Sequence, residues 1–169
     1  RIIIQDAKDG IRDEAYLSNS KRETCMGSPI PLNQVQRLQQ RCDKINALYR
    51  KDRKKYKYCR AIFIHVDSRS KGTQTDVFFT TPTAKPRVSA CQKHEGNLES
   101  KYDKHQPNRG FSGTVSGRNL YVLAHTSPPL FFVELGNIQN TFDQRRLVIP
   151  SNRQALAKWL MEGFIKDYK

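Results

Sequence analysis

Residues 130–136 read Leu-Phe-Phe-Val-Glu-Leu-Gly, an apolar run that contains one carboxylate, that of Glu134. A continuous apolar run of this length is typical of a strand buried on both faces of a sheet. Burying an unpaired carboxylate is costly, so Glu134 must be paired, bind a metal or lie at a cleft. The alternative is a Glu at the solvent end of the strand, paired with one of the surplus cations. The residues alone favour neither interpretation.

A second apolar run ends close to an imidazole. Residues 61–67 read Ala-Ile-Phe-Ile-His-Val-Asp, and we expect a buried strand over residues 59–66. A lone histidine such as His65 is more often structural than a ligand. Asp67 follows two residues later on the same side of the pleat, where it can orient the imidazole. Polar groups on two strands of one small sheet favour a shared site.

The pattern along the chain predicts an α/β fold. Apolar residues three and four positions apart predict helices over residues 32–50 and 152–168. Further strands are expected over residues 2–4, 76–80 and 119–123. We therefore predict one domain over residues 1–169, built on a single twisted, mostly parallel mixed sheet of about five to six strands flanked by helices. Residues 81–117 are polar and rich in Lys, Pro and Gly, and are expected to form an insert in this domain.

The chain is strongly basic, with a net charge of +14 from 30 Lys and Arg against 16 Asp and Glu. A field of this sign attracts polyanions such as nucleic acid, an anionic cell envelope or acidic lipid. The densest cluster is Arg-Lys-Asp-Arg-Lys-Lys-Tyr-Lys at residues 50–57. It is either a solvated loop after a helix or a polyanion contact. Tyr49, Tyr56 and Tyr58 lie among these cations, where they would allow stacking of nucleic-acid bases.

The four cysteines exclude one kind of metal site. No two of them form a Cys-x-x-Cys pair, so a structural zinc knuckle is not expected. Their even number permits disulfides in an oxidising compartment without requiring them. No apolar run is long enough to span a bilayer.

Two motifs resemble those of a known enzyme family. Residues 63–69, Phe-Ile-His-Val-Asp-Ser-Arg, resemble the third metal-ligand motif of the zinc-dependent N-acetylmuramoyl-L-alanine amidases of the amidase-3 type. Residues 132–138, followed by Asn140 and Asp143, resemble the motif that holds the catalytic glutamate of these enzymes.

Further segments match the family in its own order. Residues 29–32 resemble the start of the helix before the ligand strand, and residues 108–110 and 119–123 resemble the strand before the catalytic glutamate. The resemblance covers about residues 30–169. Residues 119–169 resemble the variant found in Bacteroidetes-type bacteria.

The resemblance implies a function and a set of site residues. It implies a peptidoglycan hydrolase, periplasmic or secreted in bacteria, that cleaves the amide between N-acetylmuramic acid and L-alanine. Glu134 would be the catalytic base, and His65 and Glu14 would be two ligands of a Zn²⁺ cofactor. Asn108 and Arg109 would line the substrate groove, and the insert at residues 81–117 would act as a lid, as an autoinhibitory segment does in related enzymes.

The N-terminal part departs from the family pattern. No histidine precedes His65, and the Gly-His-Gly loop expected after residues 2–4 is absent, as is the first long helix. Glu23 fits the ligand position less well than Glu14. Either the sequence skips segments, or the chain is an inactive relative that binds an anionic polymer, cell wall or nucleic acid, through its basic surface. Skipped segments are favoured, because loss of a core helix would expose one face of the sheet.

Overall fold

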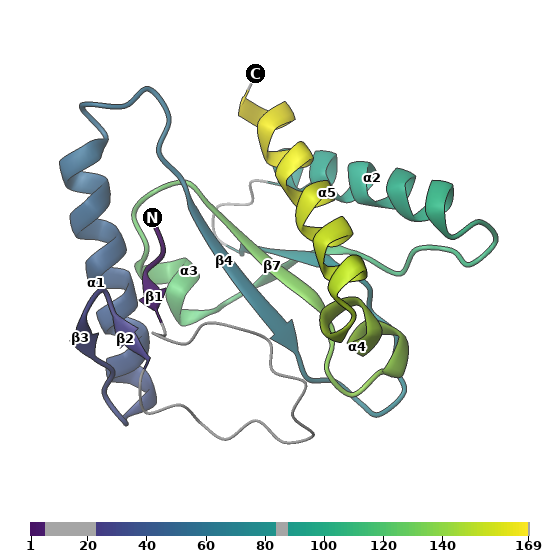
Figure 1. Ribbon diagram of the computed structural model, residues 1–169. Coiled ribbons are helices and arrows are strands. Elements are labelled where there is room, and N and C mark those ends of the chain that lie inside the picture. Colours follow the sequence, from purple (N-terminus) through teal and green to yellow (C-terminus); the bar gives the residue numbers. More distant parts are fainter. Residues whose placement is uncertain (6–22, 84–87, 169) are drawn as a thin grey trace. The chain divides into compact units, whose positions relative to one another are not determined.

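The computed structural model describes residues 1–5, 23–83 and 88–168 (Figure 1). The chain divides into two compact units. The first comprises residues 1–61 and 120–129, and the second comprises residues 62–119 and 130–169.

The first unit combines a small sheet with two helices. Its antiparallel strands are β1 (Ile4–Gln5), β2 (Thr24–Cys25) and β3 (Ser28–Pro29), and its helices are α1 (Gln34–Asp52) and α3 (Tyr121–His125). Asn33 caps α1, since its side chain accepts a hydrogen bond from the backbone N–H of Gln36 at 3.1 Å. Asn46 joins α1 to the end of α3 by donating to the carbonyl of His125 at 2.9 Å.

The second unit is built on a mixed four-stranded sheet with the order β4–β7–β5–β6. Its strands are β4 (Ala61–Asp67), β5 (Phe78–Pro82), β6 (Val115–Arg118) and β7 (Leu130–Asn137). β5 pairs with β6 in parallel and with β7 antiparallel. β4 and β7 run in the same direction, because Ala61 bonds to Pro129 at one end and Ile138 bonds to Asp67 at the other.

The predicted α/β class and mixed sheet are therefore confirmed, with four strands in this sheet instead of five or six. Two expected strands lie elsewhere. Of residues 2–4, Ile4 alone is in a strand, β1 of the separate small sheet, and of residues 119–123 the last three lie in helix α3. The run Leu-Tyr-Val-Leu has no clear period of two or of 3.6, so a short helix and a strand cannot be told apart there.

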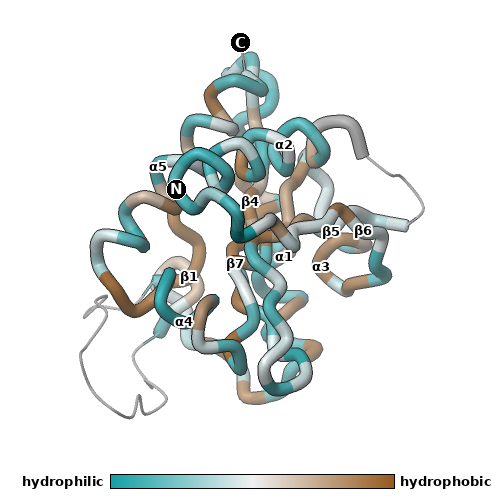
Figure 2. The backbone as a smooth tube through the Cα atoms, turned by 90° about the vertical axis from the view of Figure 1, so that its right-hand side faces the viewer, coloured by the Kyte–Doolittle hydropathy of each residue, from teal (hydrophilic) through white to brown (hydrophobic). Residues whose placement is uncertain are grey.

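One face of the sheet packs against α2 (Val88–His105) and α5 (Pro150–Tyr168), which lie side by side (Figure 1). Figure 2 shows that the outer helix α2 is mostly hydrophilic along its length. The buried side chains of this core are Val77, Phe79, Cys91, Leu98, Tyr102, Phe131, Val133, Leu156 and Leu160. Gly163 allows α5 to approach α2, because a Cβ there would lie 2.6 Å from Nδ1 of His94.

Helix α2 occupies much of the stretch 81–117 that sequence patterning assigned to an insert. Cys91, Leu98 and Tyr102 of α2 are buried, so this part of the stretch contributes to the core. The buried stripe of α2 also includes His94. Because histidine is polar, it interrupts the apolar pattern by which a helix is recognised in the sequence. Whether the stretch also covers the site stays a prediction.

The end of the chain holds two helices. The predicted final helix is confirmed as α5, which begins with Pro150 in the first turn, where its missing N–H is not needed. The preceding helix α4 (Thr141–Val148) was not predicted. It is capped by Asn140, whose side chain accepts hydrogen bonds from the backbone N–H groups of Phe142 and Asp143.

The outer side of β4 is apolar and exposed. Ile62, Ile64 and Val66 are 44%, 62% and 41% exposed and point away from the face that carries Phe63 and His65. Apolar residues on both faces are typical of a strand covered on both sides. Within the described ranges, α2 and α5 cover β5 and β7 but leave this side of β4 open.

The packing of α2 predicts a large effect of one truncation. Leu98→Ala should lower the free energy of unfolding by about 2–5 kcal/mol, because Leu98 is 1% exposed and its loss leaves a cavity. Urea unfolding followed by circular dichroism measures the change. Leu32→Ala is the matched control, since Leu32 is 98% exposed. Equal midpoints for the two variants would contradict a core position for α2.

Candidate functional site

His65 and Glu134 lie on the same face of the sheet, on neighbouring strands. The ring of His65 stacks on Phe132 with 4.5 Å between ring centroids. Glu134 follows Phe132 by two residues on β7 and therefore points to the same side of the pleat. The helices α2 and α5 pack on the other face, against Phe131 and Val133. The structure thus brings the two predicted residues of the second unit to one face.

Glu134 is a buried acid with an unusual protonation equilibrium. Its side chain is 5% exposed and pairs in register with Phe78 of β5. Among the described residues, its Oε2 atom has no hydrogen-bond partner. Burial, reinforced by the charge of Asp67, raises the pKa of Glu134 to about 7, against the opposing effect of Arg118 and Arg69. A carboxyl group with this pKa can both accept and donate a proton near neutral pH.

The carboxylate of Asp143 fixes the end of β7. Its Oδ2 atom accepts hydrogen bonds from the backbone N–H groups of Asn137 and Thr75, each at 3.0 Å. Gly136 permits the close approach, because its φ is +146° and a Cβ there would lie 2.8 Å from Cβ of Asp143. Three residues of the glutamate motif therefore act together to hold the strand that carries Glu134.

Asn137 ties the loop after β4 to the same strand end. Its amide nitrogen donates to the carbonyl of Ser70 at 3.1 Å and to that of Thr73 at 2.7 Å. Its amide oxygen accepts the backbone N–H of Arg69 at 3.0 Å. Since Asn137 is fully buried, these bonds position the loop against the site face. Sequence patterning placed Arg69 in the histidine motif but gave no sign that it lies near Glu134.

Arg109, a predicted substrate-binding residue, belongs to a buried ion network. Its guanidinium pairs with the fully buried Asp76 at 3.1 Å and lies 4.9 Å from the ring centroid of Tyr102. Arg146 also pairs with Asp76 and contacts the same ring. Asn108, the other predicted substrate residue, is exposed and takes the left-handed conformation at φ 66° after α2. A contact of either residue with substrate stays a prediction.

The described residues do not supply a complete zinc site. Glu14, predicted as a ligand, lies outside the described ranges. His94 packs on Phe131, on the face opposite His65, and is buried. In the part of the chain that the structure describes, no three His, Cys, Asp or Glu side chains are grouped to hold a metal ion. Of the two predicted zinc ligands, the described residues therefore include only His65.

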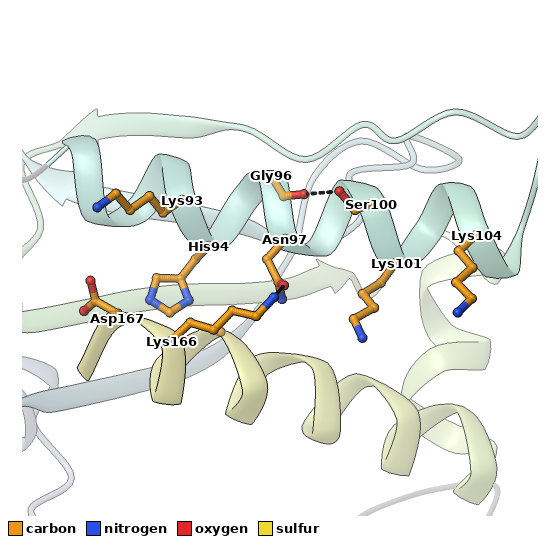
Figure 3. A pocket seen from close by; sticks show the side chains of 10 residues that line it. Lys93, His94, Gly96, Asn97, Ser100, Lys101, Lys104, Lys166 and Asp167 are labelled. Atoms are coloured by element: carbon orange, nitrogen blue, oxygen red, sulfur yellow. Dashed lines mark hydrogen bonds between the residues drawn. The ribbon is translucent and has the colours of Figure 1, made fainter. Parts of the chain in front are cut away.

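A groove of about 700 Å³ lies between α2 and α5, and Figure 3 shows its lining. Lysines from both helices extend along it, among them Lys93, Lys104 and Lys166. His94 also lines it and packs on the face of the sheet opposite His65. The groove is therefore separate from Glu134.

Solved amidase structures share this fold. An N-acetylmuramoyl-L-alanine amidase from Clostridium difficile 630 matches with a TM-score of 0.62 at 15% identity, over 82% of this chain and 66% of its own. AmiC2 of Nostoc punctiforme matches with a TM-score of 0.59 at 15% identity, over 83% and 68%. Ami1 from Mycobacterium abscessus matches with a TM-score of 0.58 at 19% identity, over 78% and 61%. The chain thus spans about two thirds of the length of these amidases.

The sequence comparison assigns the family. No curated protein matches the chain in sequence. The family model described as N-acetylmuramoyl-L-alanine amidase, however, matches residues 11–166, which is nearly the whole chain. The chain therefore belongs to the N-acetylmuramoyl-L-alanine amidase family.

Proposed function

We propose that the protein hydrolyses the amide between N-acetylmuramic acid and the L-alanine of the peptidoglycan stem peptide, with Glu134 as the catalytic base. The observation that carries this proposal is the buried carboxyl of Glu134, which shares a sheet face with His65 and has a pKa of about 7. Family membership supports the same reaction. Peptidoglycan as substrate implies a periplasmic or secreted enzyme. Among the described helices, none is both long and apolar enough to cross a membrane.

Glu134 suits proton transfer in amide hydrolysis. The reaction requires a base that takes a proton from the attacking water and an acid that protonates the departing amine. A carboxyl with a pKa near the working pH can perform both steps in turn. The aromatic rings of Phe78 and Phe132 lie beside Glu134 on the same face and maintain the low polarity that raises its pKa.

Zinc dependence is part of the proposal. His65 would be one ligand and Glu14 a second, and the third would be a histidine with no counterpart before His65 in this sequence. When bound by three protein ligands, zinc lowers the pKa of a coordinated water and polarises the scissile carbonyl. Asn108 and Arg109 stay candidates for the groove that receives the substrate.

Two substitutions separate the proposed roles. Glu134→Gln should lower stem-peptide release from muropeptides by about 100-fold or more, because it removes the base while leaving bound zinc unchanged. His65→Ala should lose zinc together with activity. Chromatography of the products and elemental analysis of the purified protein measure the two effects. Glu99→Gln, at an exposed position on α2, serves as the control. Undiminished hydrolysis by Glu134→Gln would exclude its catalytic role.

The raised pKa of Glu134 predicts a pH-dependent stability. The folded protein retains this proton up to about pH 7, whereas the unfolded chain releases it near pH 4.5. The folded state binds more protons between these values, so the contribution of Glu134 to stability falls as the pH rises through them. The free energy of unfolding of Glu134→Gln, relative to that of wild type, should rise by about 2–3 kcal/mol from pH 4.5 to pH 8. Urea unfolding in the presence of a chelator tests this, and a constant difference would contradict it.

A second candidate function is binding of an anionic polymer, either as an aid to hydrolysis or in an inactive relative. Residues 50–60 in the first unit hold seven Lys and Arg and a single acid, Asp52. Arg1 pairs with that acid at 2.6 Å, which neutralises it. Lys55 lies 5.6 Å from the ring of Tyr56 and Arg60 lies 4.9 Å from that of Tyr58. Cations already contact these rings, so charge and not base stacking would govern binding.

The contribution of the basic residues 50–60 to polymer binding can be separated from that of the net charge of the whole chain. Changing Lys54, Lys55 and Lys57 to Gln should weaken binding to isolated cell-wall polymer and reduce its salt dependence. The matched control changes Lys93, Lys104 and Lys158 to Gln, which removes the same charge from exposed positions on α2 and α5. Sedimentation at several salt concentrations measures binding, with single-stranded DNA as a second ligand. Equal losses in the two variants would show that net charge alone attracts the polymer.

A further inference from the structure

Arg69 lies beside Glu134 with a fixed side chain. Its guanidinium carbon is 4.7 Å from the ring centroid of Phe78, the residue that pairs in register with Glu134. Its Nε atom donates to Oδ2 of Asp67 at 2.6 Å. The backbone N–H of Arg69 is held by the buried Asn137. Ring, carboxylate and backbone contacts therefore keep the guanidinium at the end of the site face.

The outer part of this guanidinium is available to a ligand. The side chain of Arg69 is 46% exposed, although it contacts both Asp67 and Phe78. Its bond to Asp67 uses Nε, and among the described residues its two terminal nitrogens donate no hydrogen bond. Arg69 pairs with Asp67 and not with Glu134, so Glu134 remains free to exchange its proton. Two parallel N–H groups match the two oxygens of a carboxylate.

We propose that Arg69 binds a carboxylate of the stem peptide, on the peptide side of the scissile amide, and so makes the enzyme prefer a free carboxylate over its amide. The inference rests on the proposed function, since it concerns the substrate of the same face. The muramyl sugar is neutral apart from the lactyl group that forms the amide, so the peptide supplies the anion that a guanidinium recognises. Arg69 is a specificity-determining residue in this arrangement and takes no part in proton transfer.

Binding of two synthetic ligands tests the inference without turnover. The ligands are N-acetylmuramoyl-L-alanyl-D-glutamate and its counterpart with both carboxylates of the glutamate amidated. All proteins are full-length chains that carry Glu134→Gln, and calorimetry measures their affinities. Arg69→Gln should weaken binding of the carboxylate ligand by about ten- to a hundredfold and leave the amidated ligand unchanged. Arg69→Lys should recover part of the loss, because it keeps the charge but not the paired N–H groups.

The outcomes separate this inference from the proposed function. Arg118→Gln is the control, since Arg118 also acts on Glu134 but lies on β6. Equal weakening of both ligands by Arg69→Gln, or no change in either, overturns the role of Arg69 and leaves the proposed function intact. Discrimination lost in Arg118→Gln instead of Arg69→Gln also overturns it. If the parent protein binds neither muramyl dipeptide, the proposed function fails as well.

Discussion

The fold around the site depends on one buried carboxylate, that of Asp143. Its oxygens accept hydrogen bonds from the loop before β5, from the end of β7 and from Arg146 of the same helix. A fully buried carboxylate is tolerated only when its hydrogen-bonding capacity is filled, and losing one partner of such a pair costs about 3–5 kcal/mol. The three partners belong to separate segments. Because all of them must be in place to fill the hydrogen-bonding capacity of this one side chain, Asp143 holds the three segments together. Gly136 makes this possible by giving the carboxylate room.

The residues around Asp143 therefore support the site rigidly, while Arg69 lies at its exposed edge. Asn137, whose backbone bonds to Asp143, holds the loop after β4 by its side chain, and that loop carries Arg69. Glu134 stays buried and His65 stays half-buried on the same face. Charged groups that are fixed before a ligand arrives need little rearrangement in the reaction, which is the property expected of a catalytic site. The ion network around Asp76 extends the same support to Arg109 and Tyr102.

Much of this arrangement could be predicted from the sequence, for reasons that particular residues show. Strands β4 and β7 are continuous apolar runs, and α1 and α5 carry a regular stripe of apolar residues, so their patterns are strong. Helix α2 was missed because His94 and Tyr102 occupy buried positions of its stripe. The motif that includes Asn137 and Asp143 was visible, but not their mutual bonds, which depend on contacts between distant segments. The raised pKa of Glu134 was likewise invisible, because burial depends on the whole sheet.

The protonation of Glu134 bears on whether the chain is an enzyme or a binding module. An acid whose pKa rises on folding opposes folding at neutral pH, so it reduces the stability of the protein that carries it. A module that binds polymers through residues 50–60 gains nothing from such a group, and a neutral side chain would serve its fold better. Among the residues that the structure describes, the Oε2 atom of Glu134 has no hydrogen-bond partner, which adds to this cost. Groups that lower stability without structural benefit are characteristic of active sites, where the chemistry requires them. The interior of the second unit therefore favours catalysis.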